Sequence, residues 1–247
     1  MISRYIFILV LMALVFGCTN APEPKDVMLS SIEKSAKLKS LITDLTMNMT
    51  VLSQATTSII TTDIVQYKLD KMTRTDIIVK GVPQLEGVEM RVYSIEEGTY
   101  LCGKKDEWDC LSFGGDIGLT GEGFGGAQDW EGMSRGIVES DAFEFVGGVE
   151  RLEISGRPCW LVSARIDYSK ASSFLNFSQD VKNVTLSQCL DDETGVALSG
   201  RIVTEMTGGP GSEDGGILIN QIDMYVNQLN VNATISDSTF ELPATPR

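Results

Sequence analysis

The chain has 247 residues, 43% of them hydrophobic and 22% charged, which are ordinary values for a globular protein long enough to bury a sizeable core. Its 34 acidic and 20 basic residues give a formal net charge of −14. A surface this acidic repels phosphate backbones, so we expect no nucleic-acid partner. The chain has no histidine, the commonest general base and metal ligand, which argues against most hydrolases and zinc enzymes but leaves carboxylate chemistry open.

The first residues have the pattern of an export signal. Arg4 precedes an apolar run from Ile6 to Phe16, which is too short to span a bilayer, so we interpret residues 1–17 as a signal peptide. The following Val15-Phe16-Gly17-Cys18 resembles the lipobox of prokaryotic lipoproteins, which predicts a lipid on Cys18. The alternative is an uncleaved N-terminal anchor with an incidental cysteine. Either way we expect an extracytoplasmic domain held to the membrane. The lipobox interpretation makes residues 18–25 a lipidated tether and residues 26–247 the folded part.

Four further cysteines, an even number in an exported chain, suggest two disulfides with three possible pairings. Cys102 and Cys110 flank a turn-like stretch and could close a hairpin, in which case Cys159 and Cys189 would bridge two later strands. Free buried thiols are the alternative.

Asn48, Asn176, Asn183 and Asn232 begin sequences that fit the N-glycosylation acceptor pattern. Acceptor sites in use, together with a lipobox, would point to an archaeal cell surface. A bacterial lipoprotein that carries the pattern by chance is the alternative.

The first half of the folded part predicts one helix followed by a β-meander. The helix is expected over residues 26–41. Residues 41–51 alternate clearly, which directs Met47 and Met49 inward and Asn48 outward, although Thr43 interrupts the apolar set. Further strands are expected over residues 57–70, 73–80, 88–95, 99–102 and 107–113.

The second half predicts more strands around two helices and two loops. A glycine-rich flap is expected over residues 114–126, and the other loop over residues 207–216. Helices are expected over residues 129–143 and 169–181. The remaining strands are expected over residues 148–154, 157–167, 186–191, 196–206, 217–229 and 231–240.

The residues that could carry chemistry favour binding over catalysis. Carboxylates cluster at Glu96-Glu97, Asp106/Asp109 and Asp191-Asp192-Glu193. All of these clusters lie at predicted turns, where acidic residues are common, and none has the spacing of an EF-hand calcium loop. We therefore expect no metal and no cofactor. Without a histidine base or a GxSxG elbow we expect no enzyme. Methionine adapts to irregular ligands, so we expect a hydrophobic cavity, although plain core packing is the alternative. The candidate lining residues are Leu45, Met47, Met49, Val51, Met72, Met90 and Val92.

Five short motifs follow one another in an order that resembles the LolA/LppX-like family of lipoprotein carriers and lipid-binding lipoproteins. They are Lys71-Met72-Thr73-Arg74-Thr75-Asp76, Val92-Tyr93-Ser94-Ile95 with Gly98-Thr99-Tyr100, Gly156-Arg157-Pro158-Cys159-Trp160-Leu161-Val162, Cys189-Leu190-Asp191 with Thr194-Gly195-Val196, and Ser238-Thr239-Phe240-Glu241-Leu242-Pro243.

With the preceding helix, these motifs cover about residues 26–243. The resemblance implies a mainly β (α+β) fold, a strongly curved antiparallel half-barrel with helices packed on the concave face and a cavity that binds lipid chains. Because the LolA carrier is soluble, a tethered binder like the LppX branch fits this chain better than a shuttle. The rival implication is an envelope sensor or interaction module that binds a membrane-protein partner.

Overall fold

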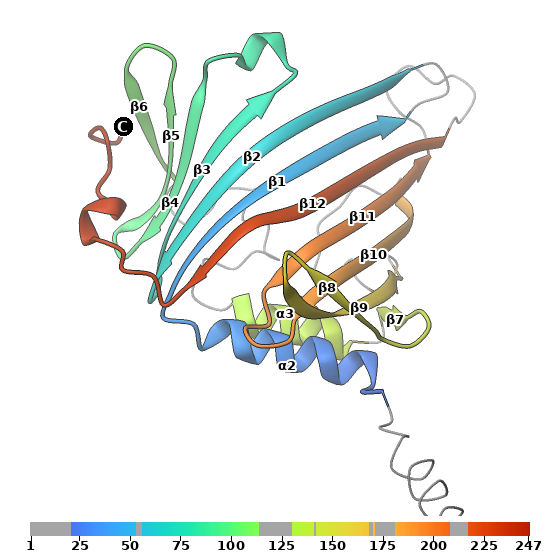
Figure 1. The fold of residues 1–247 in the computed structure, drawn as a ribbon. Helices are drawn as coiled ribbons and strands as arrows, with labels where there is room; N and C mark the ends of the chain where they lie inside the picture. Colours follow the sequence, from blue (N-terminus) through green and yellow to red (C-terminus); the bar gives the residue numbers. More distant parts are fainter. Residues whose placement is uncertain are drawn as a thin grey trace, which may run out of the picture.

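The computed structural model describes residues 21–52, 56–113, 130–140, 142–167, 170, 181–207 and 217–247. Most of them form one open, curved antiparallel sheet of 12 strands, which confirms the mainly β half-barrel (Figure 1). The order is β6-β5-β4-β3-β2-β1-β12-β11-β10-β9-β7, and β8 also pairs with β9. The first-half strands are β1 (Ser40–Leu52), β2 (Thr57–Leu69), β3 (Met72–Lys80), β4 (Glu89–Ile95), β5 (Gly98–Lys104) and β6 (Trp108–Phe113). The second-half strands are β7 (Phe143–Phe145), β8 (Glu150–Ile154), β9 (Arg157–Ile166), β10 (Val181–Asp191), β11 (Ala197–Thr207) and β12 (Ile217–Val231).

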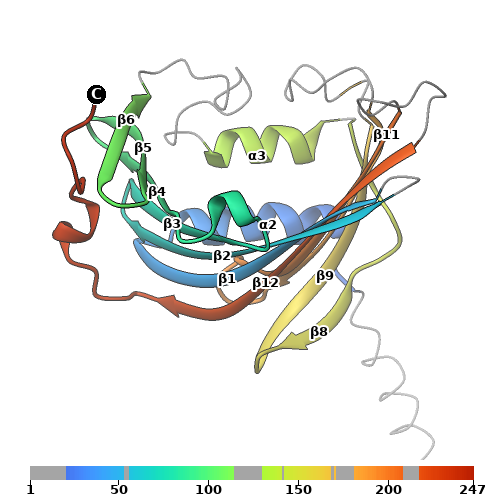
Figure 2. The same cartoon turned by 90° about the horizontal axis from the view of Figure 1, so that it is seen from above.

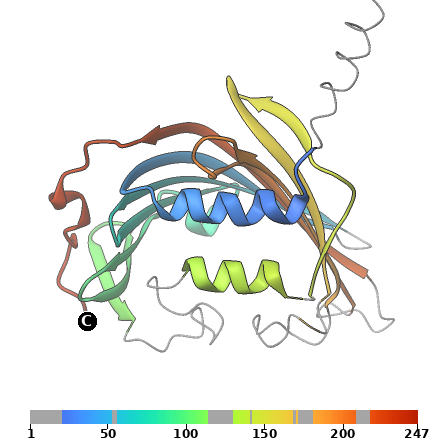
Figure 3. The same cartoon turned by 90° about the horizontal axis from the view of Figure 1, so that it is seen from below.

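Two α-helices, α2 (Pro24–Ala36) and α3 (Trp130–Glu139), lie on the concave side of the sheet, as predicted (Figures 2 and 3). They meet β9 and β10 in a core to which α2 contributes Val27 and Met28, and α3 contributes Val138. The sheet contributes Val162 and Leu190. This packing closes one end of the half-barrel.

The register of the sheet identifies which residues share the concave side with the helices. Leu186 of β10 packs against the helix core. Its cross-strand partner is Ile202, which pairs in turn with Ile222, and Ile222 pairs with Met49. Cross-strand partners point to the same face, so Met49 faces the concave side. We call this side the inner face and the opposite side the outer face.

At the opposite end of the sheet, the C-terminal segment (residues 241–247) covers the outer face. Tyr93 and Tyr100 are buried there beside the Cys102–Cys110 disulfide, and Leu242 and Ala244 pack against them. The segment follows the short 3-10 helix η2 (Asp237–Phe240) and continues along the edge strand β6, where the Arg247 amide donates to the Cys110 carbonyl at 3.0 Å. The tail therefore covers a sheet edge that would otherwise be free.

The two disulfides confirm the hairpin pairing. Cys102–Cys110 joins neighbouring positions of β5 and β6, and Cys159–Cys189 joins β9 to β10. The second bridge is buried on the outer face beneath β8, with Leu198 of β11 against it. Another 3-10 helix, η1 (Pro83–Leu85), connects β3 to β4.

One predicted element is wrong and another differs at its end. The strand expected over residues 231–240 does not form, because Asn232 leaves β12 with a φ of 56° and the chain then turns through η2, where Phe240 is buried. Of the helix expected over residues 169–181, Lys170 is helical, but Val181 belongs to β10. The other residues of that predicted helix lie outside the described residues. So do the flap over residues 114–126, nearly all of the loop over residues 207–216, and Cys18 with the signal peptide.

Candidate functional site

The inner face of the central strands carries a broad apolar surface. One row across the sheet consists of Val226, Leu45, Ile64, Ile77 and Met90, contributed by β12, β1, β2, β3 and β4. Neighbouring rows place Met224 beside Met47, and Ile222 beside Met49 and Ile60. These side chains are partly buried, apart from the buried Val226. Period-two alternation in each strand, combined with the register, is sufficient to build this surface.

The structure brings six of the seven predicted cavity residues to this surface and excludes one. Leu45, Met47, Met49 and Val51 project from β1, while Met90 and Val92 project from β4.

Met72 lies on the outer face, so its prediction is wrong. The two-residue turn Asp70-Lys71 pairs Leu69 with Met72, which gives Met72 the same orientation as Arg74. The guanidinium of Arg74 lies over the Tyr67 ring on the outer face, 5.2 Å from its centroid.

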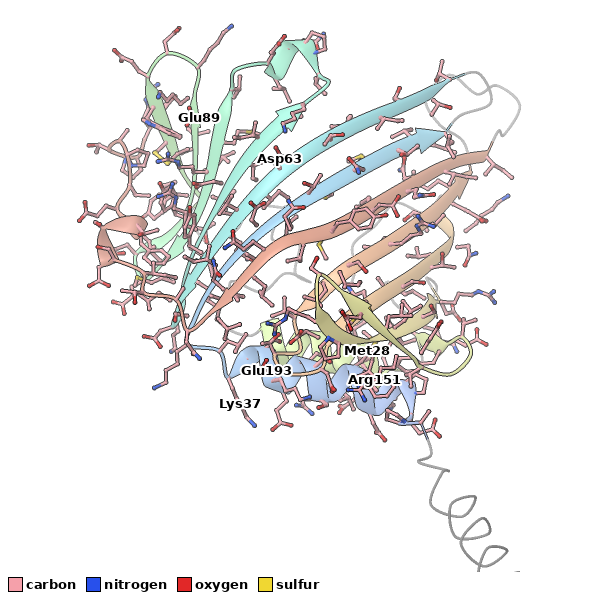
Figure 4. The ribbon with its side chains drawn as sticks, viewed as in Figure 1. Met28, Lys37, Asp63, Glu89, Arg151 and Glu193 are labelled. Atoms are coloured by element: carbon pink, nitrogen blue, oxygen red, sulfur yellow. A yellow bond between two sulfur atoms is a disulfide. The ribbon has the colours of Figure 1, made fainter. Side chains whose placement is uncertain are left out.

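The outer face of the same strands carries most of their charged side chains, beside the exposed Ile59, Ile78 and Tyr225. The Arg201 Nε donates to the Asp223 carboxylate at 2.6 Å, and the Asn227 amide donates to the Asp44 carboxylate at 3.1 Å. Lys80 pairs with Asp63, which Figure 4 labels on β2. The charged side chains of these strands therefore lie mainly on the outer face, and the inner face is the side better suited to apolar contact.

The three predicted glycosylation asparagines in the described part of the chain lie away from the inner apolar surface. Asn48 is on the outer face, and its side-chain oxygen accepts a hydrogen bond from the Thr61 hydroxyl at 2.9 Å. Asn183 lies beside Glu205 in the β10–β11 ladder, and Asn232 is exposed in the turn after β12. Asn176 lies outside the described residues. Modification of these asparagines stays a prediction.

A polar strip crosses the inner face at its helix end. Thr43 pairs with Gln66, and Lys68 lies two residues further along β2. Thr43 is only 3% exposed, and its Oγ1 has no hydrogen-bond partner among the described residues. The Lys68 ammonium donates to the Ser35 carbonyl of α2 at 3.3 Å, and burial lowers its pKa. Sequence reasoning missed this strip, although Thr43 interrupting the apolar alternation of β1 was its signal.

The Asp191-Asp192-Glu193 cluster is occupied by protein partners. Arg157 donates two hydrogen bonds to the buried Asp191 carboxylate, at 2.7 and 3.0 Å, and Thr194 donates two more. Asp192 accepts from Arg151 and from the Trp160 indole. Figure 4 labels Arg151 and Glu193 around this turn. Two clefts border it, of about 320 and 250 Å³, and Arg157, Asp191 and Asp192 on their walls already have protein partners. No group of three residues able to hold a metal occurs in the described part of the chain.

None of the helices in the described ranges is long and apolar enough to cross a membrane. No protein-family model matches the chain, and no curated protein sequence matches it.

Several solved structures resemble the chain over most of its length. The lipoprotein LppX of Mycobacterium tuberculosis is 13% identical with a TM-score of 0.43, and the match covers 85% of this chain and 97% of LppX. A DUF1329 family protein from Desulfovibrio piger is 10% identical with a TM-score of 0.37, covering 88% and 95% of the two chains. An outer membrane lipoprotein-sorting protein domain from Vibrio parahaemolyticus is 8% identical with a TM-score of 0.34, covering 87% and 95%. The likeness concerns the fold alone.

Proposed function

We propose that this protein is a membrane-anchored extracytoplasmic lipoprotein that binds or carries a hydrophobic ligand, such as a lipid acyl chain, on the inner face of its half-barrel. The observation that carries this proposal is the row of partly buried apolar side chains formed by Leu45, Ile64, Ile77 and Met90 beside Val226. Contact with an acyl chain would remove the remaining apolar area from water, which favours binding.

The chemistry of the surface supports a flexible apolar ligand. Met47, Met49, Met90 and Met224 contribute unbranched, polarizable side chains that can adjust to irregular chains of methylene groups. The curved sheet provides a concave surface, the shape on which ligands can bury most of their area. The neighbouring polar outer face keeps the same sheet compatible with water.

The anchor supports a role beside the membrane. The predicted lipid on Cys18 would be followed by only a few residues before α2 begins at Pro24. At roughly 3.5 Å per residue, such a tether holds the domain within about 21 Å of the bilayer. A binder placed there could receive lipid from the membrane to which it is attached.

Native mass spectrometry of the full chain, gently extracted from its own membranes, tests this proposal. We expect a non-covalent lipid on the wild-type protein, loss of that lipid in Met49→Glu, and its retention in Thr50→Glu. Met49 and Thr50 are neighbours on β1 with opposite orientations, and the Thr50 partners Ile59 and Gln221 are uncharged. The two variants therefore add the same charge to opposite faces, and circular dichroism checks that both fold.

A wild-type protein without bound lipid would contradict the proposal. If a stoichiometric membrane protein were isolated with it instead, the alternative role as an envelope sensor or interaction module would replace lipid binding.

A further inference from the structure

We propose that the polar strip at the helix end of the inner face, formed by Thr43, Gln66 and Lys68, is a subsite for the anionic head group of an amphiphilic ligand. This inference rests on the proposed function, because it assigns a head group to the ligand whose chain lies on the apolar surface.

The register separates the inner face into a polar and an apolar part. Lys68 pairs with Thr73, and Gln66 pairs with Thr75, so two adjacent rows of β2 and β3 are polar. The next row contains Ile64 and Ile77, and β2 then continues toward Ile60. Lys68 and Ile60 are eight positions apart on β2, which is about 26 Å along a strand. An elongated amphiphile can therefore place its head on the strip and its chain on the apolar rows.

Lys68 is the only charged residue at inner-face positions of the described strands β12, β1, β2, β3, β4 and β5. One of its ammonium hydrogens goes to the Ser35 carbonyl, and no carboxylate in the described part of the chain pairs with it. Lys80, on the outer face of the adjacent strand, does have a carboxylate partner in Asp63. An unpaired cation beside an apolar surface attracts an anion more strongly than a solvated one does, because the local dielectric constant is lower.

Thr43 supplies an independent observation. Its hydroxyl is buried and without a hydrogen-bond partner among the described residues, although it shares the inner face with Gln66. Buried hydroxyl groups nearly always have a partner. An acceptor oxygen of a bound carboxylate or phosphate would provide that partner, at a position one row away from Lys68.

Competition binding with three ligands that share an oleoyl chain tests the subsite. The full-length protein in detergent is loaded with a fluorescent fatty acid, which is then displaced by oleate, by oleoyl lysophosphatidate or by the uncharged monoolein. We expect both anions to bind about tenfold more tightly than monoolein, the difference that one charge-assisted hydrogen bond provides. Whichever anion binds more tightly distinguishes a carboxylate head from a phosphate head.

Matched variants identify the residues responsible. Lys68→Met should weaken both anions about tenfold and leave monoolein unchanged, which also shows that the variant folds. Thr43→Val, which keeps the side-chain shape, should weaken the anions about threefold. Lys71→Met removes the same charge from the exposed β2–β3 turn and should change nothing.

Two failures can be told apart. If all three ligands bind alike and Lys68→Met has no effect, the head-group subsite is wrong while lipid binding stands; a water molecule would then satisfy Thr43. If none of the three displaces or replaces the probe, the proposed function itself is wrong.

Discussion

Asp191 shows how a single buried carboxylate holds the β10–β11 turn. Burial alone would raise the pKa of its carboxyl group, but the hydrogen bonds from Arg157 and Thr194 outweigh burial and hold the pKa below its ordinary value of 3.8. A pKa that is lower in the folded state means that the charged form stabilises the fold. This stability is complete at neutral pH and is lost as the pH falls from about 3.8 through the lower folded-state pKa.

Asp191→Asn should therefore lower the free energy of unfolding by about 2 kcal/mol at pH 7, because Arg157 loses a charged acceptor. Urea unfolding at pH 7 and at several values below pH 4 measures this change. The variant should also lose less stability with acid than the wild type does. Glu193→Gln is the matched control, because the Glu193 side chain is 84% exposed and should contribute little. Equal acid sensitivity of Asp191→Asn and wild type would show that Asp191 does not stabilise the turn through its charge.

At the scale of elements, α2 is fixed to the sheet through the same turn. The Lys34 ammonium donates to the Asp192 carbonyl at 2.5 Å, and Gly195 lies directly against the Ser31 backbone. Gly195 has a φ of 72°, and a Cβ at this position would overlap Ser31. The glycine therefore serves two purposes, the left-handed turn and the close approach of the helix.

Comparing Gly195→Ala with Gly87→Ala separates those two effects. Gly87 has a similar φ of 77° but no atom within 4 Å of the added Cβ. Its replacement should cost only the left-handed strain, about 1–2 kcal/mol. Gly195→Ala should cost more than about 3 kcal/mol, because strain and overlap add, and it should speed hydrogen exchange in α2. Equal costs in urea unfolding would mean that the helix moves aside freely.

The elements that the sequence predicted well are those with an uninterrupted pattern. β1 was expected over residues 41–51 and spans Ser40–Leu52, because alternation of apolar and polar residues directly reflects a sheet with one buried face. The strand expected over residues 231–240 failed because tertiary packing decided that segment: η2 lies against β3, and Phe240 is buried. β7, only three residues long, has too few positions to show a period.

For the site, alternation identified the inward residues of β1 but could not relate one strand to another. Met72 was misplaced because the face of a strand after a tight turn depends on the turn length, and a shift of one residue reverses every side chain. The polar strip was missed for the same reason. Thr43 and Lys68 become neighbours only through the β1–β2 register, which local patterns do not specify.

At the scale of the whole molecule, packed side chains and a disulfide hold each end of the sheet. Among the described residues, the centre is held mainly by the hydrogen bonds between its strands. The tail and the Cys102–Cys110 disulfide hold β5 and β6, while α2, α3 and the Cys159–Cys189 disulfide hold β9 and β10. Between them, β12, β1 and β2 present inner-face side chains that stay partly exposed. A ligand on this surface would supply contacts that the described residues do not.

Hydrogen exchange should therefore show a localised response to ligand. Binding to the native state alone stabilises it, by about 2.7 kcal/mol when the ligand is present at 100 times its Kd. If the ligand contacts the centre of the inner face, slowed exchange should concentrate in β12, β1 and β2, where local opening exposes the binding surface. The amides of β5 and of the Asp191 turn should change least, because other contacts already hold them. Mass-spectrometric exchange of the full chain with and without oleate measures this pattern, and Met49→Glu should abolish it. A response confined to the Asp191 turn would instead place the ligand in the clefts beside Trp160, at the helix end of the sheet.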